Sequence, residues 1–387
     1  MQVDLEKKEL IIVAFNIGSF GTIMQLKGFL WTAVNLNCFS SIKVILKKQT
    51  FNKILDDRKY YEKRHNVIFY QTSNFFLEFL KLYPIQKKKI IFVPGAIGFF
   101  LGSPNLLMVQ SNLPFEEANW KRYSLLFKIK LKTARYITVF SIIFAKRLVF
   151  NTEFSKLVVK LHLPKFTHKK VDKSKVIPLG LGSTWLNEVK KKALQKPFDI
   201  FSTQTKDEIT IVYPSSFDFY KHHEFVIDVA IEFSKIYSKK IKLRFIGGGN
   251  ESRCIELENY LFSSSIKTVN LEIFQDVRHD DILGLFLDSD IGIFMSSCES
   301  FGYSLLELVS SGLPVICNNY PAHKEIFGNQ VNYTEISDPI KTAFEIKNII
   351  KNPEKTSIKA CNSQKIALTY TSNKSDTNLI KELRNLT

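Results

Sequence analysis

The 387-residue sequence lacks an apolar run close to the roughly 20 residues that a helix needs to cross a bilayer. Residues 1–6 are acidic and lack the basic start and apolar core of a secretory signal peptide. The five cysteines are scattered, without a CxxC pair or the spacing of a disulfide framework or a zinc site. We therefore expect a cytoplasmic protein of a reducing compartment, without a membrane-spanning segment.

Acidic residues are also scarce, since 37 Asp and Glu stand against 54 Lys and Arg and leave a net charge of +17. Lysines cluster at residues 87–89, 169–175 and 190–192. An anionic membrane surface, a nucleic acid and simple solubility would each explain this charge. Nucleic acid is not expected as a partner, because no helix-turn-helix, zinc, RNP or KH pattern accompanies the basic residues. Peripheral attachment to the cytosolic face of a membrane stays open beside solubility.

The N-terminal half alternates apolar strands with helical patterns. Residues 10–15, LIIVAF, form an uninterrupted apolar run typical of a buried parallel strand. A glycine loop containing Gly18 follows, and then a helix over about residues 24–36. This loop does not complete a GxGxxG fingerprint, so it gives little support to a dinucleotide site. Further strands are expected at residues 41–46, 67–69, 89–93, 106–110 and 147–150.

The C-terminal half repeats this alternation. Its strands are expected at residues 209–213, 242–249, 271–274, 290–295 and 314–317, with a helix over 341–351, a polar tail, and a last helix near 376–386. The expected domains are residues 1–190, a linker at 191–207, residues 208–360, and a tail at 361–387 that packs back toward the first domain. The predicted fold is α/β, with two Rossmann-like domains facing a cleft and ligands at the carboxyl ends of the strands.

Residues 297–307, SCESFGYSLLE, are the most informative segment of the chain. They place Glu299 in a loop after a strand and Glu307 inside the helix that follows. A helix that begins after a strand and a short loop binds anions, because its first N–H groups have no partner within the helix. Glu307, one turn deeper, suits the two hydroxyls of a ribose, and Glu299 can reach a sugar hydroxyl. The segment therefore predicts a nucleotide-sugar site.

This segment resembles the E-x7-E signature of retaining GT-B glycosyltransferases, in particular glycosyltransferase family 4, the glycosyl transferases group 1 type. The spacing of the two glutamates, the Phe301–Gly302 pair, residues 312–315 (GLPV) and Glu325 occur together and in order. The alternative is an ordinary βαβ unit with two solvated glutamates. The resemblance implies the GT-B fold and places the donor's diphosphate at the helix start, against Phe301, Gly302, Tyr303 and Ser304.

Other donor-side residues follow from the same resemblance. Lys221 matches a family lysine that neutralises the donor's pyrophosphate, whereas Ser216 stands where the family has an arginine. A single lysine with hydroxyl and backbone donors can still hold a pyrophosphate, as a point charge without the bidentate fork of arginine. Gly247 and Gly248 end a strand that borders the nucleotide in the resembled fold, although such glycines also simply turn a chain. Gly18 is expected near the donor.

The N-terminal half offers residues for the reaction and the acceptor. Residues 112–115, NLPF, look like a subset of bacterial family 4 enzymes in which an asparagine replaces a histidine near the reacting sugar, which makes Asn112 a candidate catalytic residue. Glu116 and Glu117 would bind the acceptor or cap the next helix. Asp288 and Asp290 form a DxD pair, but it straddles a helix end and a strand start, and the resembled enzymes need no metal. Neither a metal nor another cofactor is expected.

The resemblance implies a retaining, metal-independent hexosyltransferase. Glu307 would hold the ribose, and Glu299 would hold the sugar hydroxyls or the positive charge that develops at the anomeric carbon. The acceptor is expected to be a saccharide or glycolipid in surface polysaccharide or lipopolysaccharide synthesis. A GT-B nucleotide-sugar epimerase or phosphorylase is the alternative within the fold, and a basic nucleic-acid-binding or scaffold protein the alternative outside it.

Overall fold

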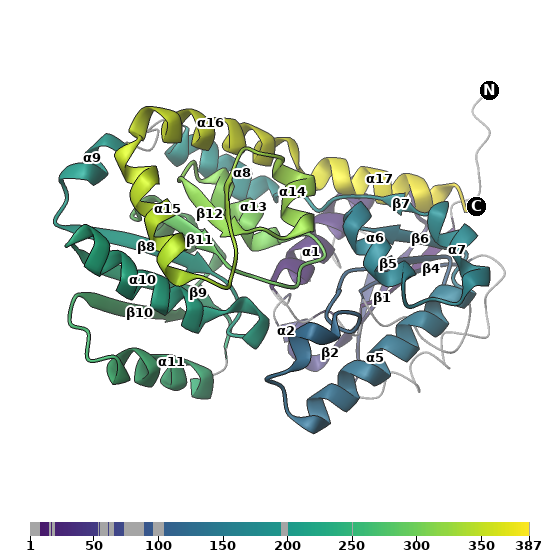
Figure 1. The fold of residues 1–387 in the computed structure, drawn as a ribbon. Coiled ribbons are helices and arrows are strands. Elements are labelled where there is room, and N and C mark those ends of the chain that lie inside the picture. The colour runs from purple at the N-terminus through teal and green to yellow at the C-terminus, as the bar shows by residue number, and fades with distance from the viewer. Residues whose placement is uncertain are drawn as a thin grey trace. The chain divides into compact units, whose positions relative to one another are not determined.

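The computed structural model divides into two compact units, each with its own parallel sheet (Figure 1). The first comprises Met1–Gly182 and Thr371–Thr387, and the second Ser183–Tyr370. The structure describes residues 8–14, 17, 20–52, 54, 61, 66–72, 89–95, 104–194, 200–249 and 251–386. Within these ranges no helix is both long enough and apolar enough to cross a membrane.

The first unit contains a seven-stranded sheet in the order β3-β2-β1-β4-β5-β6-β7, and every neighbouring pair is parallel. Its strands are β1 (Glu9–Val13), β2 (Ile42–Lys47), β3 (Val67–Thr72), β4 (Lys89–Pro94), β5 (Leu106–Val109), β6 (Arg147–Phe150) and β7 (Lys175–Val176). Its helices are α1 (Phe20–Asn35), α2 (Lys48–Asn52), η2 (Glu117–Trp120), α5 (Leu125–Phe144), α6 (Glu153–Lys160), α7 (Lys165–Asp172) and α17 (Ser372–Arg384).

The end of the chain belongs to the first unit. Leu181 and Thr371 form a parallel bridge, and α17 then packs on α1. Gly28 of α1 permits the contact, because a Cβ there would lie 3.0 Å from Oδ2 of the buried Asp376. Thr32 donates its hydroxyl to the same oxygen at 3.5 Å. Burial raises the pKa of Asp376 well above its ordinary value.

The second unit contains a six-stranded parallel sheet in the order β10-β9-β8-β11-β12-β13. Its strands are β8 (Glu208–Pro214), β9 (Lys240–Gly247), β10 (Val269–Gln275), β11 (Ile291–Phe294), β12 (Val315–Asn318) and β13 (Asn332–Thr334). Its helices are α8 (Ser183–Glu188), η3 (Val189–Ala193), α9 (Ile200–Thr205), η4 (Phe219–Lys221), α10 (His223–Tyr237), α11 (Glu251–Ser263), α12 (His279–Leu287), α13 (Tyr303–Ser310), α14 (Pro321–Phe327), α15 (Pro339–Lys351) and α16 (Pro353–Thr369).

Both sheets are the parallel α/β sheets that the apolar strand patterns predict, but two segments differ from the prediction. The predicted polar tail after residue 351 begins with the helix α16. This helix buries Thr356, Ala360, Ser363 and Ala367, which are small residues at helical spacing, so no apolar stripe marks it in the sequence. The segment 191–207, expected as a linker, contains the end of η3 and α9, and it belongs to the second unit.

Candidate functional site

The strand order of the second unit fixes where a ligand is expected. Chain order reverses between β8 and β11, and ligands of open parallel sheets bind beyond the carboxyl ends of the strands at such a reversal. The loops that follow these two strands are bonded to each other in their first turns. The amide of Ser297 donates to the carbonyl of Tyr220 at 2.9 Å, and the Ser297 hydroxyl lies 2.7 Å from Nε2 of His222. The loops are thus held as one surface.

Lys221 and Glu299 come together at this point. The Lys221 ammonium forms an ion pair with Oε1 of Glu299, and the lysine as a whole is only 7% exposed. Its Nζ also lies 5.4 Å from the ring centre of Phe294 and 5.0 Å from that of Tyr220. The Tyr213 hydroxyl fixes the lysine backbone by donating to its carbonyl at 2.6 Å. A charge in such low-dielectric surroundings acts strongly on a neighbouring anion.

The N-terminus of α13 follows Glu299 in the same loop. Gly302 is the cap residue and has a φ of +93°, a backbone conformation that glycine adopts without a steric cost. Phe301 before it is buried against Tyr370, with ring centres 5.8 Å apart. The first intrahelical bond runs from the Leu306 amide to the Gly302 carbonyl, so the amides of Tyr303 and Ser304 head the helix. Helix geometry directs such amides and the positive end of the dipole at an anion.

Glu307 lies one turn into α13, where it is buried. Nε2 of His279 donates to its Oε1 at 2.7 Å, and His279 in turn stacks on Trp185 with ring centres 4.9 Å apart. The Trp185 indole donates to the Ser310 hydroxyl at 2.8 Å. Burial raises the pKa of Glu307, and the bond from His279 acts against this rise. The carboxyl group is thus held in one orientation by side chains far away in sequence.

Ser216, Gly247 and Gly248 lie at the ends of β8 and β9. The Ser216 hydroxyl donates to Oδ2 of Asp218 at 2.7 Å. A Cβ on Gly247 would lie 1.9 Å from the carbonyl oxygen of Ser215, so only glycine fits where the two loops approach. Gly248 is exposed. Close packing against Ser215 therefore explains why residue 247 is a glycine, independently of any ligand.

His323 is a member of this neighbourhood that no sequence pattern indicates. It is fully buried, and a Cβ on Gly302 would lie 3.4 Å from its ring. Its Nδ1 donates to the Asn318 carbonyl at 3.2 Å, and no described residue provides a hydrogen-bond partner for Nε2. Burial lowers its pKa to about 4, so the ring is neutral at physiological pH. His279 is the first residue of α12, and no sequence pattern links it to Glu307 or Trp185.

The remaining residues that the sequence suggests for the reaction, the donor and the acceptor belong to the first unit. Asn112 is buried, its Oδ1 accepts from the Ser155 hydroxyl at 2.7 Å, and its carbonyl accepts from the Phe115 amide at 2.7 Å. Glu117 pairs with Arg135 at 2.6 Å, and Glu116 caps η2 without a side-chain bond to its amides. Gly18 lies outside the described residues. The roles of these residues in catalysis, donor binding and acceptor binding stay predictions.

The aspartates of the DxD pair have separate partners. Asp288 accepts from Nη1 of Arg244 at 2.9 Å. Asp290 is buried, where it accepts from the Thr210 amide at 2.8 Å and pairs with Lys206 at 2.5 Å. No group of three or more metal-ligating side chains occurs within the described ranges. The pair thus joins a strand start to its neighbours by ordinary ion pairs.

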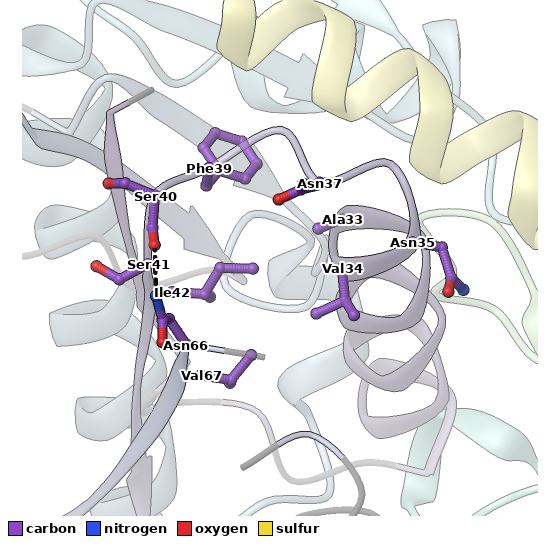
Figure 2. Close-up of a pocket in the computed structure, with 10 residues that line it drawn as sticks. All are labelled: Ala33, Val34, Asn35, Asn37, Phe39, Ser40, Ser41, Ile42, Asn66 and Val67. Atoms are coloured by element: carbon purple, nitrogen blue, oxygen red, sulfur yellow. Dashed lines mark hydrogen bonds between the residues drawn. The ribbon is translucent and has the colours of Figure 1, made fainter. Parts of the chain in front are cut away.

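A cavity of about 440 Å³ lies elsewhere, in the first unit, between the end of α1 and the start of β2 and β3 (Figure 2). Asn66 donates to the Ser40 carbonyl at 3.2 Å on one side of it. The cavity is at the amino ends of the strands, whereas ligands of open parallel sheets bind at the carboxyl ends. We therefore do not assign it to the candidate site.

Comparisons with known proteins show what this chain is similar to. Residues 195–365 match the family model described as Glycosyl transferases group 1. Among solved structures, HepE of Anabaena in complex with UDP-glucose is 14% identical, with a TM-score of 0.69 over 98% of this chain and 100% of that chain. A trehalose 6-phosphate synthase of Burkholderia multivorans is 8% identical, with a TM-score of 0.66 over 98% of each chain.

A glycosyltransferase of Rickettsia africae is 14% identical, with a TM-score of 0.63 over 98% of this chain and 99% of that chain. No curated protein sequence matches the chain. The likenesses to solved structures confirm the predicted GT-B fold. The segment that matches the Glycosyl transferases group 1 model lies within the second unit, which also contains Lys221, Glu299 and Glu307.

Proposed function

We propose that this protein is a retaining glycosyltransferase of the family 4 type, which moves a sugar from a nucleotide-sugar donor to a saccharide or glycolipid acceptor. The observation that carries the proposal is the meeting of the Lys221–Glu299 pair with the N-terminus of α13 at the point where strand order reverses. This arrangement lies within the segment that matches the group 1 transferase model. The solved complex of HepE with UDP-glucose favours a UDP-sugar as the donor.

In this proposal the donor is held through its charges and hydroxyls. The amides that head α13 and the ammonium of Lys221 bind the diphosphate, and they stabilise the negative charge that grows on it as the glycosidic bond breaks. Glu307, oriented by His279, accepts hydrogen bonds from the ribose hydroxyls. Glu299 faces the sugar, where its carboxylate binds hydroxyls or stabilises the positive charge on the anomeric carbon.

The transfer step needs no carboxylate nucleophile in this scheme. The bond from the anomeric carbon to the diphosphate breaks, and a new bond forms to the acceptor oxygen on the same face of the sugar. The acceptor's proton passes to the departing diphosphate oxygen, so the configuration at the anomeric carbon is retained. Because Lys221 and α13 already supply positive charge, the proposed reaction requires no metal ion.

The proposed biological setting is the synthesis of a surface polysaccharide or lipopolysaccharide at the cytosolic face of a membrane. The basic clusters of the sequence and a net charge of +17 motivate this setting. An enzyme of this kind would approach an anionic leaflet through electrostatic attraction and keep its acceptor near the surface.

Turnover of a donor panel tests the proposal. Purified protein is first screened with UDP-, GDP- and ADP-sugars for thermal stabilisation, and the stabilising donor is then incubated with and without saccharide or glycolipid acceptors. We expect nucleoside diphosphate to be released when an acceptor is present, with a retained anomeric configuration in the product and unchanged rates in EDTA. Interconversion of the donor without an acceptor would indicate the epimerase instead, and the absence of any donor binding would point to a non-catalytic protein.

A further inference from the structure

The helix α5 of the first unit is labelled in Figure 1. It presents a stripe of large apolar side chains to solvent. Leu125 is 73% exposed, Leu126 80% and Tyr136 63%, and Ile129 and Phe144 are also exposed. At about 100° per residue these five positions lie within one side of the helix. The stripe therefore extends along the helix axis rather than consisting of isolated surface residues.

Basic residues border this stripe, and α5 contains no acidic residue. Lys130 and Lys132 are exposed on its two sides, and Lys128, two residues before Lys130, is partly exposed. Lys121 and Arg122 precede the helix and are exposed as well. The nearest preceding carboxylate, that of Glu117, is paired with Arg135. The helix thus combines an apolar stripe with positive charge along both of its edges.

The exposed stripe belongs to a helix that is firmly attached to the unit. Leu131, Thr138, Ser141 and Ile142 are buried on its other side. The Ser124 side chain caps its start by accepting from the Phe127 amide at 3.3 Å. Lys170 of α7 caps its end, where the ammonium donates to the carbonyls of Ile142 and Ile143 at 3.0 and 2.8 Å. The apolar side chains are therefore presented on a fixed surface.

We propose that this face of α5 is the surface through which the protein lies on an anionic lipid bilayer. The helix would rest in the plane of the membrane, with its apolar stripe among the acyl chains and its lysines at the lipid phosphates. The proposal rests on the membrane setting of the proposed function and names the element responsible. It does not depend on which sugar is transferred.

Charge decides between this partner and others. A second copy of the same face would bring lysines against lysines without an acidic residue on α5 to offset them. A nucleic acid would use the charges but would leave the apolar stripe in water. The lysine clusters that the sequence suggests are less suited, because Lys191 and Lys192 pair with Glu188 and Lys170 is bonded to α5. An anionic leaflet satisfies both the charge and the apolar surface.

Co-sedimentation with vesicles of phosphatidylcholine, with and without phosphatidylserine, tests the proposal at near-physiological salt. We expect the wild-type protein to sediment with the anionic vesicles only. The triple variant Leu125→Ser, Leu126→Ser, Ile129→Ser should lower the partition coefficient about tenfold or more, because it removes the groups that enter the acyl region. The double variant Lys130→Gln, Lys132→Gln should lower it by a similar factor.

Matched controls remove equivalent groups from the second unit. Ile255→Ser, Phe262→Ser, Ile358→Ser removes three exposed apolar side chains, and Lys351→Gln, Lys355→Gln removes two exposed charges. Both should bind vesicles as the wild type does. Wild-type protein that remains in solution with anionic vesicles, a triple variant that still binds, or a stable dimer that the triple variant disrupts would overturn the proposal.

Thermal stabilisation by the nucleotide-sugar panel, measured on the same variants, separates this proposal from the proposed function. Loss of vesicle binding with unchanged donor stabilisation is the expected result for the α5 variants. If the protein binds vesicles but no nucleotide sugar stabilises it, the role of α5 as the docking surface stands and the proposed transferase function is contradicted.

Discussion

At the scale of single residues, the site is defined by charged groups that the fold holds away from water. Lys221 is nearly buried, and its partner Glu299 arrives from a loop 78 residues further along the chain. Glu307 has a comparable arrangement with His279. Groups held in this way do not reorganise when a ligand arrives, which is what electrostatic stabilisation of a leaving diphosphate requires.

Replacing Lys221 tests the role of its charge. Lys221→Met should weaken binding of the donor or free nucleoside diphosphate by about 10- to 100-fold, because it removes a charge-assisted bond to phosphate. Lys221→Arg should retain part of the affinity, since it keeps the positive charge. Lys235→Met is the matched control, because Lys235 is an exposed lysine whose partner Glu232 lies on the surface of the same unit. Isothermal titration that gave equal affinities for Lys221→Met and the wild type would remove Lys221 from the site.

His279 is expected to position Glu307 rather than to take part in the chemistry. His279→Ala should raise the donor KM about tenfold and change kcat little, because the ribose contact is made equally in the ground state and the transition state. His279→Gln should recover part of the affinity, since its amide nitrogen can donate where Nε2 does. Steady-state kinetics on the three proteins measure this split. A loss confined to kcat would assign His279 a different role.

At the scale of elements, the site depends on how α13 begins. Gly302 permits a sharp turn from the Glu299 loop into the helix, and His323 packs beside it. The helix then places Glu307 one turn deeper, where it meets His279 at the start of α12. Three segments far apart in sequence thus meet around the first turn of a single helix.

Gly302→Ala tests the need for this turn. At a φ of +93° the substitution should lower the free energy of unfolding by about 1–2 kcal/mol and weaken diphosphate binding, because the first amides of α13 shift. Gly284→Ala in α12 is the control, since no atom lies within 4 Å of its added Cβ. That change should be neutral or stabilise the protein by up to about 1 kcal/mol. Denaturant unfolding and titration with nucleoside diphosphate give both quantities, and an unaffected Gly302→Ala protein would contradict the account.

The elements also show which parts of the structure can be read from the sequence. The strand predicted at residues 147–150 coincides with β6 (Arg147–Phe150), because a buried parallel strand is an uninterrupted apolar run. The spacing of the glycine and the two glutamates also predicts that Glu299 lies in a loop and Glu307 in the helix that follows, and the structure has this arrangement. The helix α16 was missed because small residues form its buried face. Trp185 and His323 could not be predicted, since their contacts exist only after distant segments have packed.

At the scale of the whole molecule, each unit has a parallel sheet whose strand order reverses once. In the second unit this reversal coincides with the candidate donor site and with two buried histidines. His223 lies 3.0 Å from the Ser215 hydroxyl beneath the loop after β8, and His323 lies beside Gly302. We therefore expect the stability of the fold and the candidate donor site to depend on the same neutral side chains.

These histidines predict an acid-sensitive fold. Burial lowers the pKa from 6.5 to about 3 for His223 and to about 4 for His323. Below pH 6.5 the unfolded chain gains protons that the folded chain does not, so the free energy of unfolding should fall as pH decreases toward about 4. Each histidine contributes up to about 1.4 kcal/mol per pH unit. Chemical denaturation at several pH values across this range measures how steeply the free energy of unfolding depends on pH. His323→Asn should make this dependence less steep. An unchanged dependence in that variant would contradict a lowered pKa for His323.

The central claim is that the site around α13 binds a nucleotide sugar. Isothermal titration of the wild-type protein and of Glu307→Ala with the UDP-, GDP- and ADP-sugar panel tests it most directly, with the melting transition of the variant verifying that it is folded. The account predicts that at least one nucleotide sugar binds the wild type and that Glu307→Ala loses about 10- to 100-fold in affinity. Failure of every nucleotide sugar to bind, or equal affinity in the variant, would contradict it.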